Sequence, residues 1–281
     1  MNPSPVVLIT GASSGIGLSA AQLFSEKGWI VYGAARRLER MKSLESKGVR
    51  ILPLDVTDDQ SMQDCVQSVI QQAGRIDCLI NNAGYGFFGA VENVPIEDAR
   101  HQLEVNLVGL ARMVQLVLPY MRQQKCGRII NVSSIAGRFS MPFGAWYHAT
   151  KFAVEGWSES LRAEVKPFGI KVALIEPGPI KTDWGIIAAD HLAAVSKGGA
   201  YEERAFSIAN LMRLGYSRNY LSTPDVIAKA MYHAASSRCP KLRYVKGSFA
   251  KLGVFLHGIL GSRLFARLLD RAFRIAPKLV K

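Results

Sequence analysis

Short apolar runs alternate with longer amphipathic stretches through roughly the first 180 residues of this chain. Several runs are apolar at consecutive positions, which is typical of strands covered on both faces. Because a strand, a helix and a second strand form a right-handed parallel crossover, the alternation predicts an α/β fold with a doubly wound parallel sheet. We expect strands at 6–9, 30–32, 49–52, 76–80, 128–132 and 170–175, and helices near 15–27, 37–47, 58–73, 96–123 and 147–166.

The remaining sequence departs from this rhythm. Residues 183–222 lack the alternation, and we interpret them as a helical segment that folds over a substrate site as a lid. A helix is expected after Thr223-Pro224-Asp225, which is a typical helix start, and a strand at 242–246 ends the sheet. The sequence thus predicts a single domain over residues 1–247 and an extension over 248–281.

Composition excludes several classes of protein. With 49% hydrophobic and 20% charged residues, the chain suits a packed globular fold rather than disorder. The four cysteines form no CxxC pair and the five histidines form no ligand-spaced cluster, so we expect neither a disulfide scaffold nor a metal site. No apolar run reaches the ~18 residues of a membrane span, and the N-terminus lacks the cationic stretch of a signal peptide. A cytoplasmic location is therefore expected.

The net charge of +13 is unevenly distributed. Residues 238–281 hold 11 basic residues and one acid, Asp270, whereas residues 1–237 carry only +3. A nucleic-acid-binding domain usually spreads its basic residues over a face of the fold. We therefore expect no nucleic-acid partner and look for a separate role for the basic C-terminal segment.

The first expected strand runs into a glycine-rich turn that precedes the first helix. Glycines let the backbone approach a pyrophosphate, and the helix N-terminus offers N–H groups and a positive dipole. Any strand-to-helix turn can use glycine, but a position after the first strand of an alternating chain favours dinucleotide binding. The predicted phosphate-binding residues are Gly11, Ser13, Ser14, Gly15, Ile16 and Gly17.

The second expected strand ends in Arg36-Arg37, whereas NAD-selective proteins commonly place an acid there to hold the ribose hydroxyls. The first acid, Glu39, falls on the following helix. Guanidinium groups can bind a 2′-phosphate as a fork and stack over it. The alternative is that both arginines bind no ligand and are only solvent-exposed residues at the start of a helix. We predict NADP(H), with NADPH preferred over NADH.

Tyr147 and Lys151 stand four residues apart at an expected helix start and so share one helix face. Proton transfer by a phenol near neutral pH requires its pKa to fall by ~3 units, or ~4 kcal/mol. A cation ~4 Å away supplies about that much at an effective dielectric constant of ~20. The spacing therefore predicts a Tyr147 phenol made acidic by Lys151, although as an isolated pair the two could be purely structural.

These motifs occur in order with four others: Asn81-Asn82-Ala83-Gly84, Asn106 in Val105-Asn106-Leu107, Ser133-Ser134, and Pro177-Gly178-Pro179-Ile180-Lys181-Thr182. Over about residues 5–182 the chain resembles the short-chain dehydrogenase/reductase family in its TGxxxGxG, NNAG and YxxxK form, which has a Rossmann-type fold.

The resemblance implies a role for each matching residue. Tyr147 would be the general acid/base, and Lys151 would hold the nicotinamide ribose and tune Tyr147. Ser134 would hydrogen-bond the substrate oxygen, with Ser133 as the competing choice, and Asn106 would anchor a water that passes protons to Lys151. Asp55 and Val56 would contact adenine, Asn82, Ala83 and Gly84 would line its ribose, and Pro177, Gly178, Ile180 and Thr182 would border the nicotinamide. As alternatives, Asn81 and Asp55 could cap turns, and Pro177-Gly178 could merely end a strand.

Apolar and aromatic side chains dominate the positions expected to face the substrate, although each could be ordinary core. They are Tyr85, Phe87, Phe88, Phe139, Met141, Phe143 and Trp146, with Trp184, Ile186 and Ile187 in the lid. They favour a bulky lipophilic carbonyl or alcohol over a sugar. The Ala35-Arg36 turn and the Arg243-Tyr244 segment resemble most the 17β-hydroxysteroid and retinol dehydrogenase branch of the family.

The basic extension predicts an amphipathic helix from Arg263 to Ile275, with arginines on one face and leucines on another. Such a helix can lie on an anionic bilayer, or it can pack on its own domain or on a second subunit with a solvated arginine face. The apolar run Leu252–Leu260 is too short to span a membrane. The family resemblance implies a homo-oligomer, either a dimer or a tetramer.

Together these features predict an NADP(H)-dependent oxidoreductase that acts on a lipophilic ketone or alcohol. Two alternatives are a catalytically silent dinucleotide-binding sensor or scaffold, and a peripheral membrane protein that carries lipid.

Overall fold

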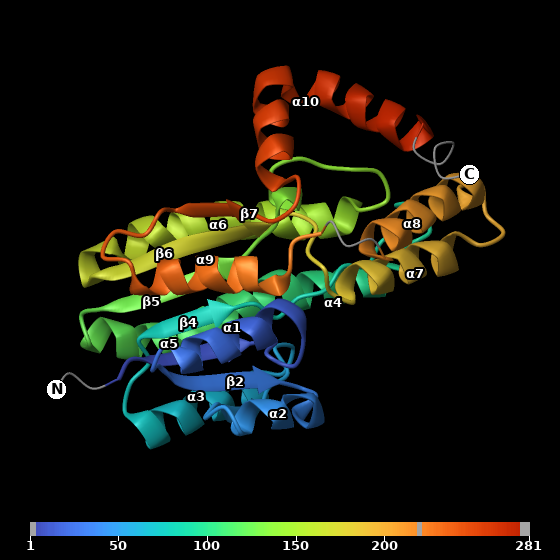
Figure 1. The fold of residues 1–281 in the computed structure, drawn as a ribbon. Helices are drawn as coiled ribbons and strands as arrows, with labels where there is room; N and C mark the ends of the chain where they lie inside the picture. The colour runs from blue at the N-terminus through green and yellow to red at the C-terminus, as the bar shows by residue number, and fades with distance from the viewer. Residues whose placement is uncertain (1–3, 218–220, 276–281) are drawn as a thin grey trace.

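A parallel sheet of seven strands, in the order β3-β2-β1-β4-β5-β6-β7, forms the centre of the fold (Figure 1). The computed structural model describes residues 4–217 and 221–275. The strands are β1 (Val6–Thr10), β2 (Ile30–Ala35), β3 (Arg50–Pro53), β4 (Cys78–Asn81), β5 (Gly127–Val132), β6 (Ile170–Pro177) and β7 (Arg243–Lys246). Every neighbouring pair is parallel, which confirms the predicted doubly wound α/β sheet.

Helices cover both faces of the sheet. The sheet has a hydrophobic core on each face, because successive side chains of a strand point to opposite faces. From β1, Val7 and Ile9 pack toward α1 and α9, while Val6 and Leu8 pack toward α3, α5 and α6. The helices are α1 (Gly15–Glu26), α2 (Lys42–Glu45), α3 (Asp59–Ala73), α4 (Ile96–Leu103), α5 (Gly109–Gln123), α6 (Ala145–Val165), α7 (Trp184–Ser196), α8 (Glu202–Ser217), α9 (Pro224–Ser236) and α10 (Ala250–Ile275). Short helices lie at Leu38–Met41, Glu104–Val108, Ile135–Gly137 and Lys166–Phe168.

Two expected helices differ in the structure. The stretch 37–47 forms a 3₁₀ turn and the four-residue α2, because only Met41 and Leu44 are fully buried and Gly48 turns the chain with a positive φ of 79°. The stretch 96–123 forms α4 and α5 separated by a π-helical segment, Glu104–Val108. Such π segments often lie at functional sites.

Within 183–222, the structure contains α7 and α8, which pack against each other and against the loop after β4. Their shared apolar cluster includes Phe88, Tyr147 and Leu192, so the two helices lie over the carboxyl end of the sheet. The predicted helix start at Thr223 and the last strand are present as α9 and β7. Residues 218–220 of this segment lie outside the described residues.

Helix α10 joins the apolar run and the basic amphipathic stretch into one element. Ala250–Phe273 is long and apolar enough to cross a membrane by length and composition alone, with a mean hydropathy of 1.4 and little burial. Gly261, with φ 66° and ψ 167°, bends this element sharply into a first arm (250–260) and a second arm (262–275), as Figure 1 shows. The side chains of Arg274 and Ile275 and all of 276–281 lie outside the described residues.

Candidate active site

The glycine turn connects the end of β1 to the start of α1. Gly11 and Gly15 have positive φ values of 69° and 53°, and a Cβ atom on Gly17 would lie 2.3 Å from the oxygen of Gly11. Side chains larger than hydrogen would therefore close the turn. Ser14 precedes α1 without making a side-chain cap, so the N–H groups of the first turn are not capped by that residue. This backbone cradle fits the diphosphate of a dinucleotide.

Asn82 fixes the neighbouring strand end to this turn. Its Nδ2 donates hydrogen bonds to the oxygens of Thr10 (3.0 Å) and Gly11 (3.2 Å), while the backbone N–H groups of Asn82 and Ala83 donate to Thr10 Oγ1. Asn81 instead points to Asn131 between β4 and β5, a structural contact. The predicted residues Asn82, Ala83 and Gly84 are thus brought beside the glycine turn.

Arg36 and Asp55 lie together at the ends of β2 and β3. Arg36 Nη1 is 3.9 Å from Asp55 Oδ2, and the Arg36 side chain is exposed, as is the neighbouring Arg37. Asp55 also caps a turn by accepting hydrogen bonds from the backbone and hydroxyl of Thr57. Partial burial opposes its ionisation, but the bonds from Thr57 and the charge of Arg36 outweigh burial and lower the pKa of Asp55. Guanidinium groups therefore line this edge of the site.

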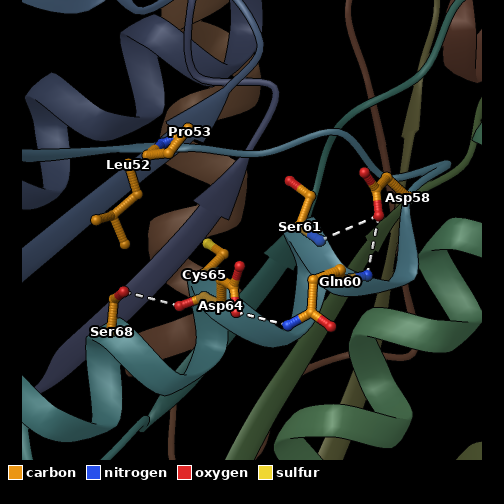
Figure 2. A pocket seen from close by; sticks show the side chains of 8 residues that line it. All are labelled: Leu52, Pro53, Asp58, Gln60, Ser61, Asp64, Cys65 and Ser68. Atoms are coloured by element: carbon orange, nitrogen blue, oxygen red, sulfur yellow. Dashed lines mark hydrogen bonds between the residues drawn. The ribbon is translucent and has the colours of Figure 1, made fainter.

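A shallow hollow lies next to this edge, between the end of β3 and the start of α3 (Figure 2). Asp58 caps α3 there by accepting from the N–H groups of Gln60 and Ser61, and the Ser61 hydroxyl accepts from the N–H of Asp55. None of the predicted cofactor-binding or catalytic residues lines this hollow. We therefore place the candidate active site elsewhere, at the centre of the carboxyl edge.

Tyr147 and Lys151 lie on the first turns of α6 and are both buried, with 8% and 6% of their surfaces exposed. Lys151 Nζ is 5.7 Å from the centroid of the Tyr147 ring and donates a 2.9 Å hydrogen bond to the oxygen of Val132, the last residue of β5. The predicted pair therefore does share one side of the helix.

Of the two adjacent serines, Ser134 contacts Tyr147. Its hydroxyl hydrogen-bonds the phenol, lies 3.3 Å from the oxygen of Pro177, and accepts from the N–H of Ala136. The Ser133 hydroxyl is buried without a hydrogen-bond partner, and the Ser133 N–H donates to Ile175 and so extends the pairing of β5 with β6. The geometry favours Ser134 over Ser133 as the residue that faces a substrate oxygen.

Asn106 lies within the π-helical segment and is 1% exposed. It donates to the oxygen of Tyr85 at 2.8 Å and to the hydroxyl of Thr150 at 3.2 Å, and accepts from the N–H of Tyr85. A Cβ atom on Gly84 would lie 3.0 Å from Asn106 Oδ1 and 3.8 Å from Lys151 Nζ. Asn106 and Lys151 therefore border the same glycine.

The pKa of Tyr147 shifts in the direction opposite to the one expected from its spacing to Lys151. Burial raises this pKa far above its usual value, and the hydrogen bond with Ser134 lowers it only in part. The expectation was wrong for this structure because the ammonium group is bonded to Val132, while Phe88 and Trp184 enclose the phenol ring. Burial also lowers the pKa of Lys151 to about 8, a shift that the carboxylate of Glu155 opposes.

A buried group of charged side chains lies near Lys151 and begins with Glu155, one turn further along α6. Glu176, which is fully buried on β6, pairs with Arg138 at 3.3 Å and Arg243 at 3.0 Å, and Arg243 also pairs with Glu155 at 3.0 Å. Burial and the nearby Glu155 carboxylate raise the pKa of Glu176 to about 7 despite both arginines. The sequence reasoning missed this cluster, which connects α6, β6, β7 and the turn after Ser134.

His148 was also missed, although it follows Tyr147 directly. Its Nε2 accepts from the N–H of Met141 at 3.1 Å, which leaves Nδ1 to donate to the oxygen of Ala136 at 2.9 Å. Burial lowers the pKa of His148, so the ring is neutral and keeps this pair of bonds. The residue holds the loop between Ser134 and α6. Only its position beside Tyr147 could have drawn attention to it.

The residues predicted to face the substrate lie in different surroundings. The rings of Phe88 and Trp184 lie 5.6 Å and 5.1 Å from the ring of Tyr147. Phe139 instead packs on α10, with its ring 4.8 Å from that of Phe265. The others have different neighbours. Phe87 stacks on His191, Tyr85 packs near His101, and Phe143 packs near Tyr201 and against the cluster that contains Tyr147. Met141 and Trp146 are half-buried, and Ile186 and Ile187 are exposed.

The loop after β6 contains the residues that were predicted to border the nicotinamide. The N–H of Gly178 donates to the oxygen of Lys246, Ile180 is buried, and a Cβ atom on Gly15 would lie 3.0 Å from Cγ2 of Thr182. Pro177 and Thr182 therefore lie between the Ser134 turn and the glycine turn, and Val56 lies buried next to Asp55. Among residues 4–217 and 221–275, no group of three or more acidic, histidine or cysteine side chains is arranged to hold a metal.

Comparison with known proteins places these features in a family. Residues 5–190 match a family model described as short chain dehydrogenase. A 3-ketodihydrosphingosine reductase of Bacteroides thetaiotaomicron is 48% identical over 178 residues, which are 63% of this chain and 64% of that reductase, so the match spans under two thirds of its length. An NADPH-dependent 3-dehydrocapnine reductase of Ornithobacterium rhinotracheale is 33% identical over 85% of this chain and 86% of that protein.

A solved structure extends the likeness to nearly the whole chain. A short-chain dehydrogenase from Streptomyces avermitilis superposes with a TM-score of 0.79 at 32% identity, covering 97% of this chain and 98% of that one. The match of two thirds of the sequence to the family model and the shared fold lead to one conclusion: the chain belongs to the short chain dehydrogenase family.

Proposed function

We propose that this protein is an NADP(H)-dependent oxidoreductase that transfers a hydride between the cofactor and a carbonyl or alcohol of a bulky lipophilic substrate. The observation that carries the proposal is the buried trio of Tyr147, Ser134 and Lys151 beneath Phe88 and Trp184. A few polar groups in an apolar enclosure suit a substrate with one reactive oxygen on an apolar body.

Within this trio, Tyr147 is the residue that transfers the proton. A bound nicotinamide dinucleotide supplies or accepts the hydride. The raised pKa of Tyr147 keeps its phenol protonated near neutral pH, so it can donate a proton to a substrate oxygen that also accepts from Ser134. Lys151 would hold the nicotinamide ribose, and Asn106 would anchor a water on the path that returns a proton to Tyr147.

The cofactor preference rests on the two strand ends next to the glycine turn. The glycine turn, with Ser13, Ser14 and Ile16, would hold the diphosphate, and the exposed Arg36 and Arg37 would bind a 2′-phosphate. The adenine would contact Asp55 and Val56, and its ribose would contact Asn82, Ala83 and Gly84. The nicotinamide would contact Pro177, Gly178, Ile180 and Thr182. The Ornithobacterium relative, an NADPH-dependent reductase, supports this preference.

Two relatives favour a lipid ketone within the lipophilic class. Their names describe reductases of a 3-keto and a 3-dehydro compound, and a 3-ketodihydrosphingosine carries its ketone on a long alkyl chain. We therefore place long-chain ketones ahead of steroids and retinoids. Helices α7 and α8 would act as the lid, because Trp184 begins α7 and covers Tyr147.

The remaining assignments complete the proposal. Residues 1–247 would form the cofactor-binding domain and 248–281 a separate extension. The protein would be a cytoplasmic homo-oligomer, a dimer or tetramer, with peripheral membrane contact through α10. A catalytically silent sensor or lipid carrier with this fold is disfavoured, because neither needs a hydrogen-bonded Tyr147–Ser134 pair beside Lys151.

A substrate screen that follows NADPH absorbance tests this function. It compares long-chain ketones with steroids, retinoids, ketoacyl thioesters and small aromatic ketones. We expect turnover of the lipophilic ketones and a loss of about 10²- to 10⁴-fold in the Tyr147→Phe variant, which keeps NADPH binding. Tyr120→Phe, on α5, is the matched control. Full activity of Tyr147→Phe would refute the assignment.

A further inference from the structure

An exposed row of large apolar side chains runs along the first arm of α10. Leu252, Phe255 and Ile259 follow at intervals of three and four residues, so they share one face of the helix. More than half of each side chain is exposed, namely 56%, 62% and 65%. The opposite side faces the body, where Gly253 meets the ring of Phe139. Apolar patches of this kind commonly mark binding surfaces.

The second arm packs one face on the protein and exposes the other. Phe265 is 4% exposed and packs on Phe139, and Arg204 on α8 pairs with Asp270 at 2.7 Å. These contacts hold the inner face of the arm against the protein, as expected for a helix that packs on its own domain. The outer face carries exposed leucines and arginines side by side, namely Leu264, Leu268, Arg263, Arg267 and Arg271.

The bend at Gly261 decides how this element can meet a bilayer. At a rise of ~1.5 Å per residue the arms are only about 16 Å and 21 Å long, whereas a hydrocarbon core is ~30 Å thick. Neither arm spans that thickness. Each is long enough to lie along the interface, where apolar side chains enter the acyl region and arginine stems extend toward the headgroups.

Charge identifies the occupant of this surface. The described part of α10 carries Lys251, Arg263, Arg267 and Arg271 against one acid, Asp270, which pairs with Arg204, so the helix attracts an anionic surface. A second copy of this chain would bring the same positive segment and would be repelled across a shared α10 face. The leucine–arginine mixture on the second arm also suits lipid headgroups better than a dry protein interface.

We propose that α10 is an interfacial membrane-binding element, in which the exposed rows of both arms lie on the surface of an anionic lipid bilayer without crossing it. The two arms act together: arginines of the second arm attract the surface, and Leu252, Phe255 and Ile259 of the first arm insert.

The position of α10 relative to the active site gives this contact a function. The start of the helix packs on the loop after β6, since a Cβ atom on Gly178 would lie 3.0 Å from Ala250 Cβ. Phe139, on the loop that leads from Ser134 to Tyr147, contacts the second arm. Resting on the proposed function, a lipophilic ketone would therefore reach the active site directly from the bilayer.

The test is vesicle co-sedimentation of the full chain. Vesicles contain phosphatidylcholine alone or mixed with phosphatidylglycerol, at low and high salt. We expect binding to the mixed vesicles only, with release by high salt. The variant Arg263→Gln/Arg267→Gln/Arg271→Gln should lose about 100-fold in partition coefficient, at ~1 kcal/mol per arginine. The variant Leu252→Gln/Phe255→Gln/Ile259→Gln should lose at least about 10-fold.

Matched controls alter exposed residues outside α10. Val91→Gln/Ile96→Gln/Val226→Gln and Lys27→Gln/Arg100→Gln/Lys229→Gln should bind vesicles like the wild type. All substituted side chains are exposed, and equal melting temperatures confirm that each variant is folded.

The proposal would be overturned if the wild type did not bind mixed vesicles, or if either α10 variant changed binding by less than about threefold. Retention after high-salt and alkaline washing would indicate a spanning helix and would also overturn it. The wild type could instead form a dimer and not bind vesicles. If this dimer dissociated only in the Leu252→Gln/Phe255→Gln/Ile259→Gln variant, the apolar row would be a subunit interface, which would also overturn the proposal. Vesicle binding requires no turnover, so Tyr147→Phe should bind like the wild type. The membrane proposal and the catalytic proposal therefore fail separately.

Discussion

Lys151 Nζ donates a 2.9 Å hydrogen bond to the carbonyl oxygen of Val132. This bond ties α6 to the last residue of β5, directly before the two serines of which Ser134 contacts Tyr147. The lysine therefore orients the helix that carries the phenol while its own charge is kept away from water.

Replacement of Lys151 by methionine should stabilise the protein while abolishing turnover. Burial lowers the Lys151 pKa from 10.5 to about 8, so the charged form costs about 3 kcal/mol below pH 8. Loss of the bond to Val132 offsets ~1 kcal/mol of that gain. We expect a net gain of about 2 kcal/mol in the free energy of unfolding, measured by urea denaturation at pH 7. Lys229→Met, at an exposed site, should change it by less than ~0.5 kcal/mol. A destabilised Lys151→Met variant would contradict the prediction.

The buried Glu176 should make stability fall as pH rises. Its pKa is about 7 in the folded protein, above the ordinary 4.5, so the folded state keeps a proton that the unfolded chain releases. Between pH 4.5 and 7 the wild type should lose about 3 kcal/mol relative to Glu176→Gln. Unfolding curves of both proteins across this range measure the difference. Glu159→Gln, at an exposed carboxylate whose pKa is lowered by Arg243, should not reproduce it. Parallel stability profiles for the wild type and Glu176→Gln would exclude the effect.

Arg36→Ala should weaken NADPH binding far more than NADH binding. A charged hydrogen bond contributes ~1.5–3 kcal/mol, so we expect the Kd for NADPH to rise about 10- to 100-fold and that for NADH less than threefold. Fluorescence titration of both nucleotides provides the measurement. Arg40→Ala removes a neighbouring exposed guanidinium that lies beyond the strand end and serves as the control. Equal losses for the two nucleotides would mean that Arg36 does not bind the 2′-phosphate.

Trp184→Ala should impair lipophilic substrates selectively. The indole ring lies 5.1 Å from the ring of Tyr147 and 6.0 Å from that of Phe88, so its removal opens the enclosure to water. We expect kcat/KM for a long-chain ketone to fall at least about tenfold, equivalent to ~1.4 kcal/mol, and that for a small ketone to fall less. Ile187→Ala changes an exposed residue of the same helix and should have little effect. An identical loss for both ketones would remove the proposed role of the aromatic cover.

The sequence predicted the sheet and the positions of its motifs because both depend on local patterns. Consecutive apolar residues such as Val6–Ile9 specify a buried strand, and parallel strands place their carboxyl ends on one edge. The glycine turn, Asn82, Ser134 and Tyr147 therefore had to converge. The choice of Ser134 over Ser133 followed from the family resemblance, and the structure brings Ser134 to the phenol.

The environment of each side chain could not be read from spacing. The pKa of Tyr147 depends on Trp184, which is 37 residues away in the chain and reaches the phenol only through the packing of α7. The carbonyl partner of Lys151 comes from another strand, and the charges around Glu176 come from three further elements. Phe139 was assigned to the substrate, but it is covered by α10, whose path depends on the bend at Gly261.

That bend gives one residue control over the path of α10. A φ of 66° with a ψ of 167° is accessible almost only to glycine, so any other residue at position 261 would favour a straight helix. A straight helix would carry residues 262–275 away from the body, because Phe265 reaches Phe139 and Asp270 reaches Arg204 only beyond the bend. A single codon change at this position would therefore uncover the loop between Ser134 and Tyr147 without altering any residue of that loop.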